Sequence, residues 1–173
     1  MLELPLRATL KDGTSVELDL MHPQEEPLVR DLLNAIILEG QSYPQEVPLT
    51  EVEFARYWLV HRSFVVRSGQ EILGAFYLRP NFPGRCSHTG NAGFLVQPHM
   101  RGRGVGRFMG ENMLRLARQE GFEAIMFNLV FETNVASLKL WQSLGFAVIG
   151  KIPRAVKLAD GSAIDALMMH RTL

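Results

Sequence analysis

Three glycines alternate with arginines directly before a predicted amphipathic helix. The segment reads Arg101-Gly102-Arg103-Gly104-Val105-Gly106-Arg107. Glycine lets a backbone approach a ligand closely, because it has no side chain to keep the ligand away. The free N–H groups of the first helical turn and the helix dipole both favour a negatively charged group at this end of the helix. The segment therefore indicates a phosphate site, to which the arginines add hydrogen-bond donors.

Two common phosphate-binding motifs do not fit this loop. A P-loop ends in Gly-Lys-Ser/Thr, which is missing here, and the dinucleotide fingerprint requires a third glycine where Met109 stands. The strand that follows the helix also lacks the acidic residue that would bind a ribose. A second interpretation, a glycine turn with solvated arginines, stays open at this point.

A single polar side chain, that of Asn128, interrupts the apolar run 124–131. Burying an amide costs several kcal/mol unless it is hydrogen-bonded. Asn128 is therefore either a structural amide with its bonds satisfied or an anchor for a substrate, since ligand sites combine apolar walls with a few polar groups. Glu39 and Tyr43 are two further candidates for an acceptor pocket. The alternatives for them are a solvated helix end and a packed ring.

The sequence predicts no metal site and no nucleophilic side chain. The five histidines show no metal-ligand spacing, and one cysteine excludes a cysteine-rich zinc site. Cys86 would need a histidine and an acid placed beside it to attack an acyl group, and no such pair is evident. A free thiol on a loop is the simpler interpretation.

Hydrophobic periodicity and turn residues place these side chains on strands and helices. The expected strands cover 6–10, 15–20, 63–67, 72–79, 90–96, 124–131, 147–152 and 163–171. Asp12-Gly13 predicts a hairpin between the first two, and Thr50 with Glu53 predicts the capping box of a short helix. The other expected helices cover 28–37, 105–121 and 134–145, the last with four inward residues, Val135, Leu138, Trp141 and Leu144. The run 124–131 is expected to be a central strand covered on both faces, and the pattern predicts a mixed α/β layer around one sheet.

Composition places this chain among ordinary globular proteins. It has 173 residues, of which 47% are hydrophobic and 21% charged, so we expect a single domain over 1–173. The 18 Lys and Arg balance the 18 Asp and Glu, which disfavours nucleic acid or an anionic membrane as a partner. No signal peptide or membrane span is evident, and we expect a cytoplasmic location.

The glycine segment, together with Val96-x-Pro98 before it, resembles the R/Q-x-x-G-x-G/A motif of the GNAT N-acetyltransferase superfamily. A second segment, Asn134-x-x-Ser137-x-x-x-Trp141-x-x-x-Gly145-Phe146, is similar to that family's next motif. The two together cover about residues 90–150. The resemblance implies a GNAT-like α/β fold, with a mostly antiparallel central sheet flanked by helices. Strands 90–96 and 124–131 would splay apart, residues 1–60 would form a hairpin and acceptor-side helices, and 90–150 would be the acetyl-CoA-binding core.

The resemblance also implies acetyl-CoA as the cofactor. In the family, the loop amides bind the pyrophosphate, the preceding strand pairs with the pantetheine arm, and the asparagine of the second motif touches the cofactor. Carried onto this chain, the cofactor residues are Phe94, Leu95, Val96, Arg101, Gly102, Arg103, Gly104, Val105, Gly106, Arg107 and Asn134. The thioester would then lie near Asn128, and a backbone N–H of 94–96 would polarise its carbonyl.

The family's usual catalytic residues are not present at the matching positions. Many members carry a tyrosine as the general acid where this chain has Trp141, and an indole N–H is no useful proton donor. Trp141 is expected to pack in the core or against the cofactor. Some members carry a glutamate at the position of Leu129. No catalytic acid or base is therefore predicted.

The loop at 39–44, with 129–134 and 140–146, resembles a subgroup of yeast-type acetyltransferases that act on proline analogues such as azetidine-2-carboxylate. This resemblance implies a small amino or imino acid as the acceptor, with Asn128 bonded to its carboxylate. The alternatives are a protein N-terminal or lysine acetyltransferase and a non-catalytic acyl-CoA-binding sensor. A homodimer through the C-terminal strands is also left open.

Overall fold

A computed structural model describes residues 3–60 and 62–173, so the first two residues of the predicted N-terminal region lie outside it. Eight strands form one sheet. They are β1 (Leu6–Thr9), β2 (Ser15–Leu20), β3 (Arg62–Ser68), β4 (Glu71–Pro80), β5 (Thr89–Val96), β6 (Ala124–Phe131), β7 (Ala147–Lys157) and β8 (Ala163–Thr172). The order across the sheet is β1-β2-β3-β4-β5-β6-β8-β7, and β5 with β6 is the parallel pair in an otherwise antiparallel arrangement. The predicted fold class is confirmed.

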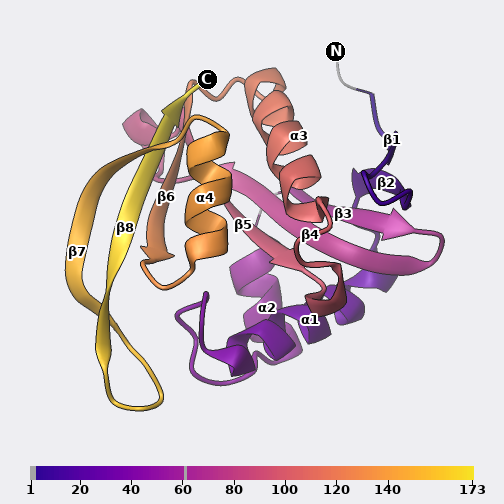
Figure 1. Ribbon diagram of the computed structural model, residues 1–173. Coiled ribbons are helices and arrows are strands. Elements are labelled where there is room, and N and C mark those ends of the chain that lie inside the picture. The colour runs from indigo at the N-terminus through magenta and orange to yellow at the C-terminus, as the bar shows by residue number, and fades with distance from the viewer. Residues whose placement is uncertain (1–2, 61) are drawn as a thin grey trace.

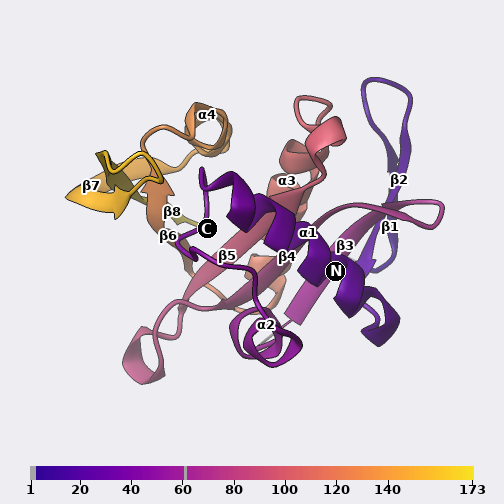
Figure 2. The same cartoon turned by 90° about the horizontal axis from the view of Figure 1, so that it is seen from below.

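The α-helices cover both faces of the sheet (Figure 1). They are α1 (Glu26–Glu39), α2 (Glu51–Trp58), α3 (Val105–Gln119) and α4 (Val135–Ser143), with 3-10 turns at Pro23–Glu25, Gly84–Cys86 and Pro98–Met100. In the view from below, α1 lies across the middle strands, on the face opposite α3 (Figure 2). The buried side chains form two clusters, one under α1 and α2 and the other under α3 and α4. None of the helices in the described ranges is long and apolar enough to cross a membrane.

Local signals in the sequence place these elements correctly. Thr50 and Glu53 form the expected capping box at the start of α2, and β1 pairs with β2 through the turn at Asp12-Gly13. Gly40 ends α1 with φ +68°, a conformation that glycine adopts at little cost. Residues Gln41 and Ser42 of the loop 40–49 and the glycine segment line the same cavity beside the sheet.

Two expectations about burial are wrong. Val135 is 52% exposed, because it is the first residue of α4 and the helix turns this position outward. Strand β6 is not covered along its whole length, since Asn128 in its middle is exposed. Trp141 and Leu144 do point inward, as predicted.

Candidate active site

Strands β5 and β6 pair over only two positions and then separate. The paired positions are Thr89 with Ala124 and Gly90 with Ile125. At the next residue, the side-chain Nδ2 of Asn91 donates a hydrogen bond to the backbone oxygen of Met126 at 2.8 Å. Asn91 is 9% exposed, and its amide therefore takes the place of a ladder bond where the strands part. A polar residue between Gly90 and Ala92 in an apolar strand was the available signal, and the sequence interpretation missed it.

The backbone N–H and C=O groups of successive β5 residues point alternately toward β4 and toward the split between β5 and β6. Gln97 N–H donates to Leu73 O on β4 at 2.9 Å, so the backbone groups of Leu95 also face β4. The groups of Phe94 and Val96 consequently face the split. Leu95 is 1% exposed, and its side chain packs under α1. Of the three predicted strand residues, Phe94 and Val96 are thus the two whose backbone groups face the split.

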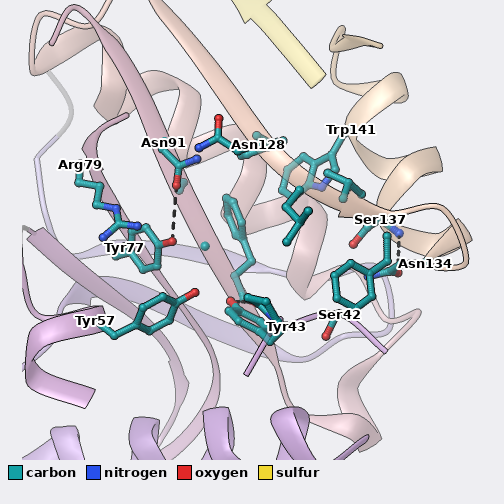
Figure 3. Close-up of a pocket in the computed structure, with 18 residues that line it drawn as sticks. Ser42, Tyr43, Tyr57, Tyr77, Arg79, Asn91, Asn128, Asn134, Ser137 and Trp141 are labelled. Atoms are coloured by element: carbon teal, nitrogen blue, oxygen red, sulfur yellow. Dashed lines mark hydrogen bonds between the residues drawn. The ribbon is translucent and has the colours of Figure 1, made fainter. Parts of the chain in front are cut away.

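Two cavities meet in the split. The small cavity, of about 240 Å³, is lined among others by Tyr43, Tyr57, Tyr77, Arg79, Asn91 and Asn128 (Figure 3). The large cavity, of about 730 Å³, runs along Val96, Gly102, Gly104, Gly106, Arg101 and Arg107. Both are lined by Ser42, Phe94, Asn134, Ser137 and Trp141. A long ligand in the large cavity would therefore present its end to a second ligand in the small one.

The glycine segment forms the wall of the large cavity at the start of α3. Gly102 has φ +75° and Gly104 φ +99°, which other residues adopt only with strain. Gly106 has ordinary φ, but a Cβ there would lie 3.4 Å from Leu140 and 3.8 Å from Val96, so it lies at the narrow part of the cavity. Val105 between them is fully buried and packs in the core. The segment thus exposes backbone, as a phosphate site requires.

The three arginines of the segment have different partners. Arg101 forms an ion pair of 2.9 Å with Glu39, and Arg107 donates to Ser143 Oγ at 2.7 Å; both arginines line the large cavity. Arg103 instead pairs with Asp12 of the β1–β2 turn at 2.6 Å and lines neither cavity. Glu39 also lines the large cavity and not the small one that Asn128 and Tyr43 line, so the structure does not bring the three predicted acceptor residues together.

Tyr43 joins the loop 40–49 to strand β5. Its hydroxyl donates to Phe94 O at 2.9 Å, on the edge that faces the split. The base of the loop is held by Asn34, whose amide exchanges two hydrogen bonds with the backbone of Leu49. Burial raises the pKa of Tyr43 well above its ordinary value of 10.0, and burial also raises the pKa of Tyr77. Both phenols therefore stay protonated and act as hydrogen-bond donors rather than bases.

Asn128 differs from the sequence expectation. It is exposed, so it is not a buried amide, and it lies at a β-bulge, where the pairing of β6 with β8 shifts between Phe127 and Val130. Its side chain lines the small cavity and exchanges two hydrogen bonds with Asn81. A bulge commonly re-aims a side chain beside a functional site.

Asn134 and Trp141 lie where the two cavities meet. Asn134 Oδ1 accepts a hydrogen bond from Ser137 N–H at 3.2 Å and thereby caps α4, as predicted. Trp141 is 6% exposed, and its ring lies 4.7 Å from that of Phe94 and 4.6 Å from that of Phe127. The indole packs in the core and also forms part of both cavity walls.

Arg79 is the one charged side chain that lines the small cavity in the described part of the chain, and no carboxylate or imidazole lines it there. The Arg79 guanidinium lies 4.8 Å from the centre of the Tyr77 ring, and it forms no ion pair with a carboxylate of residues 3–60 or 62–173. The sequence interpretation did not single out Arg79. Within the same ranges no group of His, Cys, Asp and Glu could hold a metal ion.

The fold is that of the N-acetyltransferases with which this chain superposes. A GCN5-related N-acetyltransferase from Kribbella flavida is 34% identical and superposes with a TM-score of 0.86 over 91% of this chain and 98% of that one. A phosphinothricin acetyltransferase from Sinorhizobium meliloti, solved in complex with AcCoA, has the same fold at 18% identity, with a TM-score of 0.83 over 91% and 88% of the two chains.

Sequence comparison gives the family. Residues 31–146 match the acetyltransferase (GNAT) family. The N-acetyltransferase aca1 of Schizosaccharomyces pombe is 49% identical over 144 residues, which cover 73% of this chain and 69% of that protein. The chain belongs to the GNAT acetyltransferase family, and acetyl-CoA is its acetyl donor.

The Asn91 amide gives a stability prediction for the split. Replacing Asn91 by leucine, which has a similar size, leaves the oxygen of Met126 without its donor in a partly buried place. We expect the free energy of unfolding to fall by about 1–3 kcal/mol. Urea unfolding followed by circular dichroism measures this, with Asn128→Leu at an exposed position as the matched control. Equal stability of wild type and Asn91→Leu would show that the bond to Met126 does not hold the strands at the split.

Proposed function

We propose that this protein transfers the acetyl group of acetyl-CoA to the amine of a small amino or imino acid. The observation that carries the proposal is Arg79, a cation without a carboxylate partner among the described residues, in a small cavity whose other described lining groups are uncharged. A guanidinium in such a place suits an acceptor carboxylate, which it can bind through two N–H groups. Asn128, on the same cavity, adds an amide donor.

The large cavity suits the cofactor. Its glycine segment offers the N-terminus of α3 to the pyrophosphate, with Arg101 and Arg107 beside it. The backbone groups of Phe94 and Val96 on the open edge of β5 suit the amides of pantetheine. To pair with Phe94 O, pantetheine would have to share or replace the bond from Tyr43. Asn134 lies where the acetyl group would enter the small cavity.

The chemistry follows from this arrangement. The amine nitrogen attacks the thioester carbonyl, the C–S bond breaks, and the proton lost by nitrogen is balanced by the one that the coenzyme A thiol gains. Since no carboxylate or imidazole among the described residues lines the small cavity, no such side chain there takes the proton of an ammonium group, and the acceptor has to lose that proton to water before the attack. The main contributions of the protein are then positioning of amine against thioester and backbone N–H donors of β5 near the developing oxyanion.

Mass spectrometry tests this proposal. The protein is incubated with acetyl-CoA and a pool of amino acids, proline analogues, polyamines, aminoglycosides and short peptides. We expect a product heavier by one acetyl group among the amino or imino acids, and the corresponding methyl esters or amides should react poorly because they lack the carboxylate. Acetylation of peptides or polyamines alone would contradict the proposal. Binding of acetyl-CoA with no product from any acceptor would favour an acyl-CoA sensor.

A further inference from the structure

Two asparagines form a closed pair behind the small cavity. Asn81 Nδ2 donates to Asn128 Oδ1 at 3.0 Å, and Asn128 Nδ2 donates to Asn81 Oδ1 at 2.6 Å. Asn128 lines the small cavity, whereas Asn81 lines neither cavity. A primary amide has two N–H groups and two carbonyl lone pairs. The pair uses one of each on Asn128 and leaves one of each for a ligand in the cavity.

The local backbone explains why Asn128 needs a partner. At the bulge, Phe127 of β6 pairs with Met169 of β8, and Val130 pairs with Leu167. The two pairs are three residues apart on β6 but two residues apart on β8, so β6 carries an extra residue there. A bulged residue is not fixed by the regular ladder. The side chain of Asn128 is also exposed, so core packing does not select its rotamer. Without a hydrogen-bonding neighbour, its amide would sample several orientations.

The backbone of Asn81 is held in place, so its side chain can fix that of Asn128. It follows directly after β4, and its backbone N–H donates to Thr89 O at 2.8 Å, which extends the β4–β5 pairing by one bond beyond Pro80 and Gly90. The same end of β5 pairs with β6 at Thr89 and Gly90. Asn81 is therefore tied to the one stretch where β4, β5 and β6 are held together, next to the point at which the split begins.

We propose that Asn81 is a positioning residue that fixes the amide of Asn128 for the acceptor. It acts through Asn128 and does not touch the substrate. The inference rests on the proposed function, in which Asn128 binds the acceptor carboxylate. The reciprocal pair couples the two amides, because turning over one alone would bring two N–H groups or two oxygens together. The free N–H of Asn128 is thereby held ready for the acceptor before it binds.

A double-mutant cycle tests the inference. The variants are Asn81→Ala, Asn128→Ala and the double variant, measured with the best amine acceptor found in the mass-spectrometric screen. We expect Asn81→Ala to raise the KM of the acceptor roughly three- to tenfold, which corresponds to one hydrogen bond, and to leave the KM of acetyl-CoA unchanged. Adding Asn81→Ala to Asn128→Ala should not raise the KM of the acceptor further, because the Asn128 amide through which Asn81 acts is already removed.

Four outcomes would overturn the inference. An unchanged acceptor KM in Asn81→Ala would show that the pair has no role in binding. Additive effects in the double variant would show that Asn81 acts independently of Asn128, as would a rise in the KM of acetyl-CoA. An unchanged acceptor KM in Asn128→Ala would remove the step on which the role of Asn81 depends. Thermal unfolding of each variant checks that the fold is intact, which we expect because the pair is solvent-exposed.

The test of Asn81 can succeed or fail independently of the proposed function. An acceptor outside the amino and imino acids contradicts that function, yet the cycle measured with this acceptor still confirms or overturns the role of Asn81. A nuclear magnetic resonance readout needs no acceptor. The side-chain amide signals of Asn128, assigned by their loss in Asn128→Ala, should shift in Asn81→Ala and exchange faster with water. Unmoved signals would show that the pair does not form in solution.

Discussion

Replacing Gly106 by leucine should abolish acetyl-CoA binding while the protein stays folded. A Cβ at this position would already lie 3.4 Å from Leu140 Cδ2 and 3.8 Å from Val96 Cγ2, so the rest of a leucine side chain has to extend into the large cavity. There it would cover the N–H groups at the start of α3, which are the proposed partners of the pyrophosphate. We expect the affinity to fall at least about 100-fold, or about 2.7 kcal/mol. Calorimetric titration with acetyl-CoA measures it.

The fold should not suffer, because Gly106 has ordinary helical geometry and leucine is the better helix former. Gly106→Ala is the matched control. Its single methyl group would lie in ordinary contact with the ends of the Leu140 and Val96 side chains, and the variant should retain most of the affinity. Leucine at Gly104 would be a less clean variant, because φ there is +99° and any side chain strains the backbone. Undiminished binding by a folded Gly106→Leu protein would refute the placement of the cofactor in the large cavity.

The helices and strands, and the glycine turn before α3, could be predicted from the sequence, because each has a local signal. The Thr50 capping box, the Asp12-Gly13 hairpin and the Gly40 helix stop depend on residues a few positions apart. The splayed strands followed from the family resemblance and are present in the structure. Such features require only short-range geometry or a known pattern.

The partners of site side chains could not be predicted in the same way. Asn91 bonds to Met126 and Asn81 to Asn128, at separations of 35 and 47 residues. Arg103 lies in the predicted phosphate motif but pairs with Asp12, 91 residues away. Each of these contacts depends on how distant strands meet, and nothing in the local sequence shows that. The same holds for Arg79, whose importance comes from the cavity around it rather than from its neighbours in the chain.

The small cavity combines residues from the two halves of the sheet. Tyr77 and Arg79 come from β4 and Asn91 from β5, whereas Asn128 comes from β6 across the split. The aromatic walls include Tyr43 and Tyr57 from the loop and helix that cover one side (Figure 3). An acceptor bound to both Arg79 and Asn128 would bridge the split. Its amine could then be directed at the end of the large cavity.

Replacing Arg79 by glutamine should lower kcat/KM for a carboxylate-bearing acceptor about 100-fold, since a hydrogen bond to a charged group contributes about 1.5–3 kcal/mol. For the amide of the same acceptor, which has no negative charge, kcat/KM should hardly change. The guanidinium stands 4.8 Å from the Tyr77 ring and is oriented by it, so Arg79→Lys should recover only part of the loss. The comparison of acid and amide separates a lost charge contact from a general disturbance of the site.

Arg62→Gln is the matched control for Arg79→Gln. The Arg62 guanidinium also stands over an aromatic ring, that of Phe64 at 5.8 Å, but Arg62 lines neither cavity. The Arg62→Gln variant should leave kcat/KM for the acid and for the amide unchanged. Steady-state rates of coenzyme A release, measured with a thiol reagent, give kcat/KM for the acid and for the amide with every variant. If Arg79→Gln lowered the rates for the acid and the amide equally, the guanidinium would not be the carboxylate anchor, and the choice of amino and imino acids as acceptors would lose its main support.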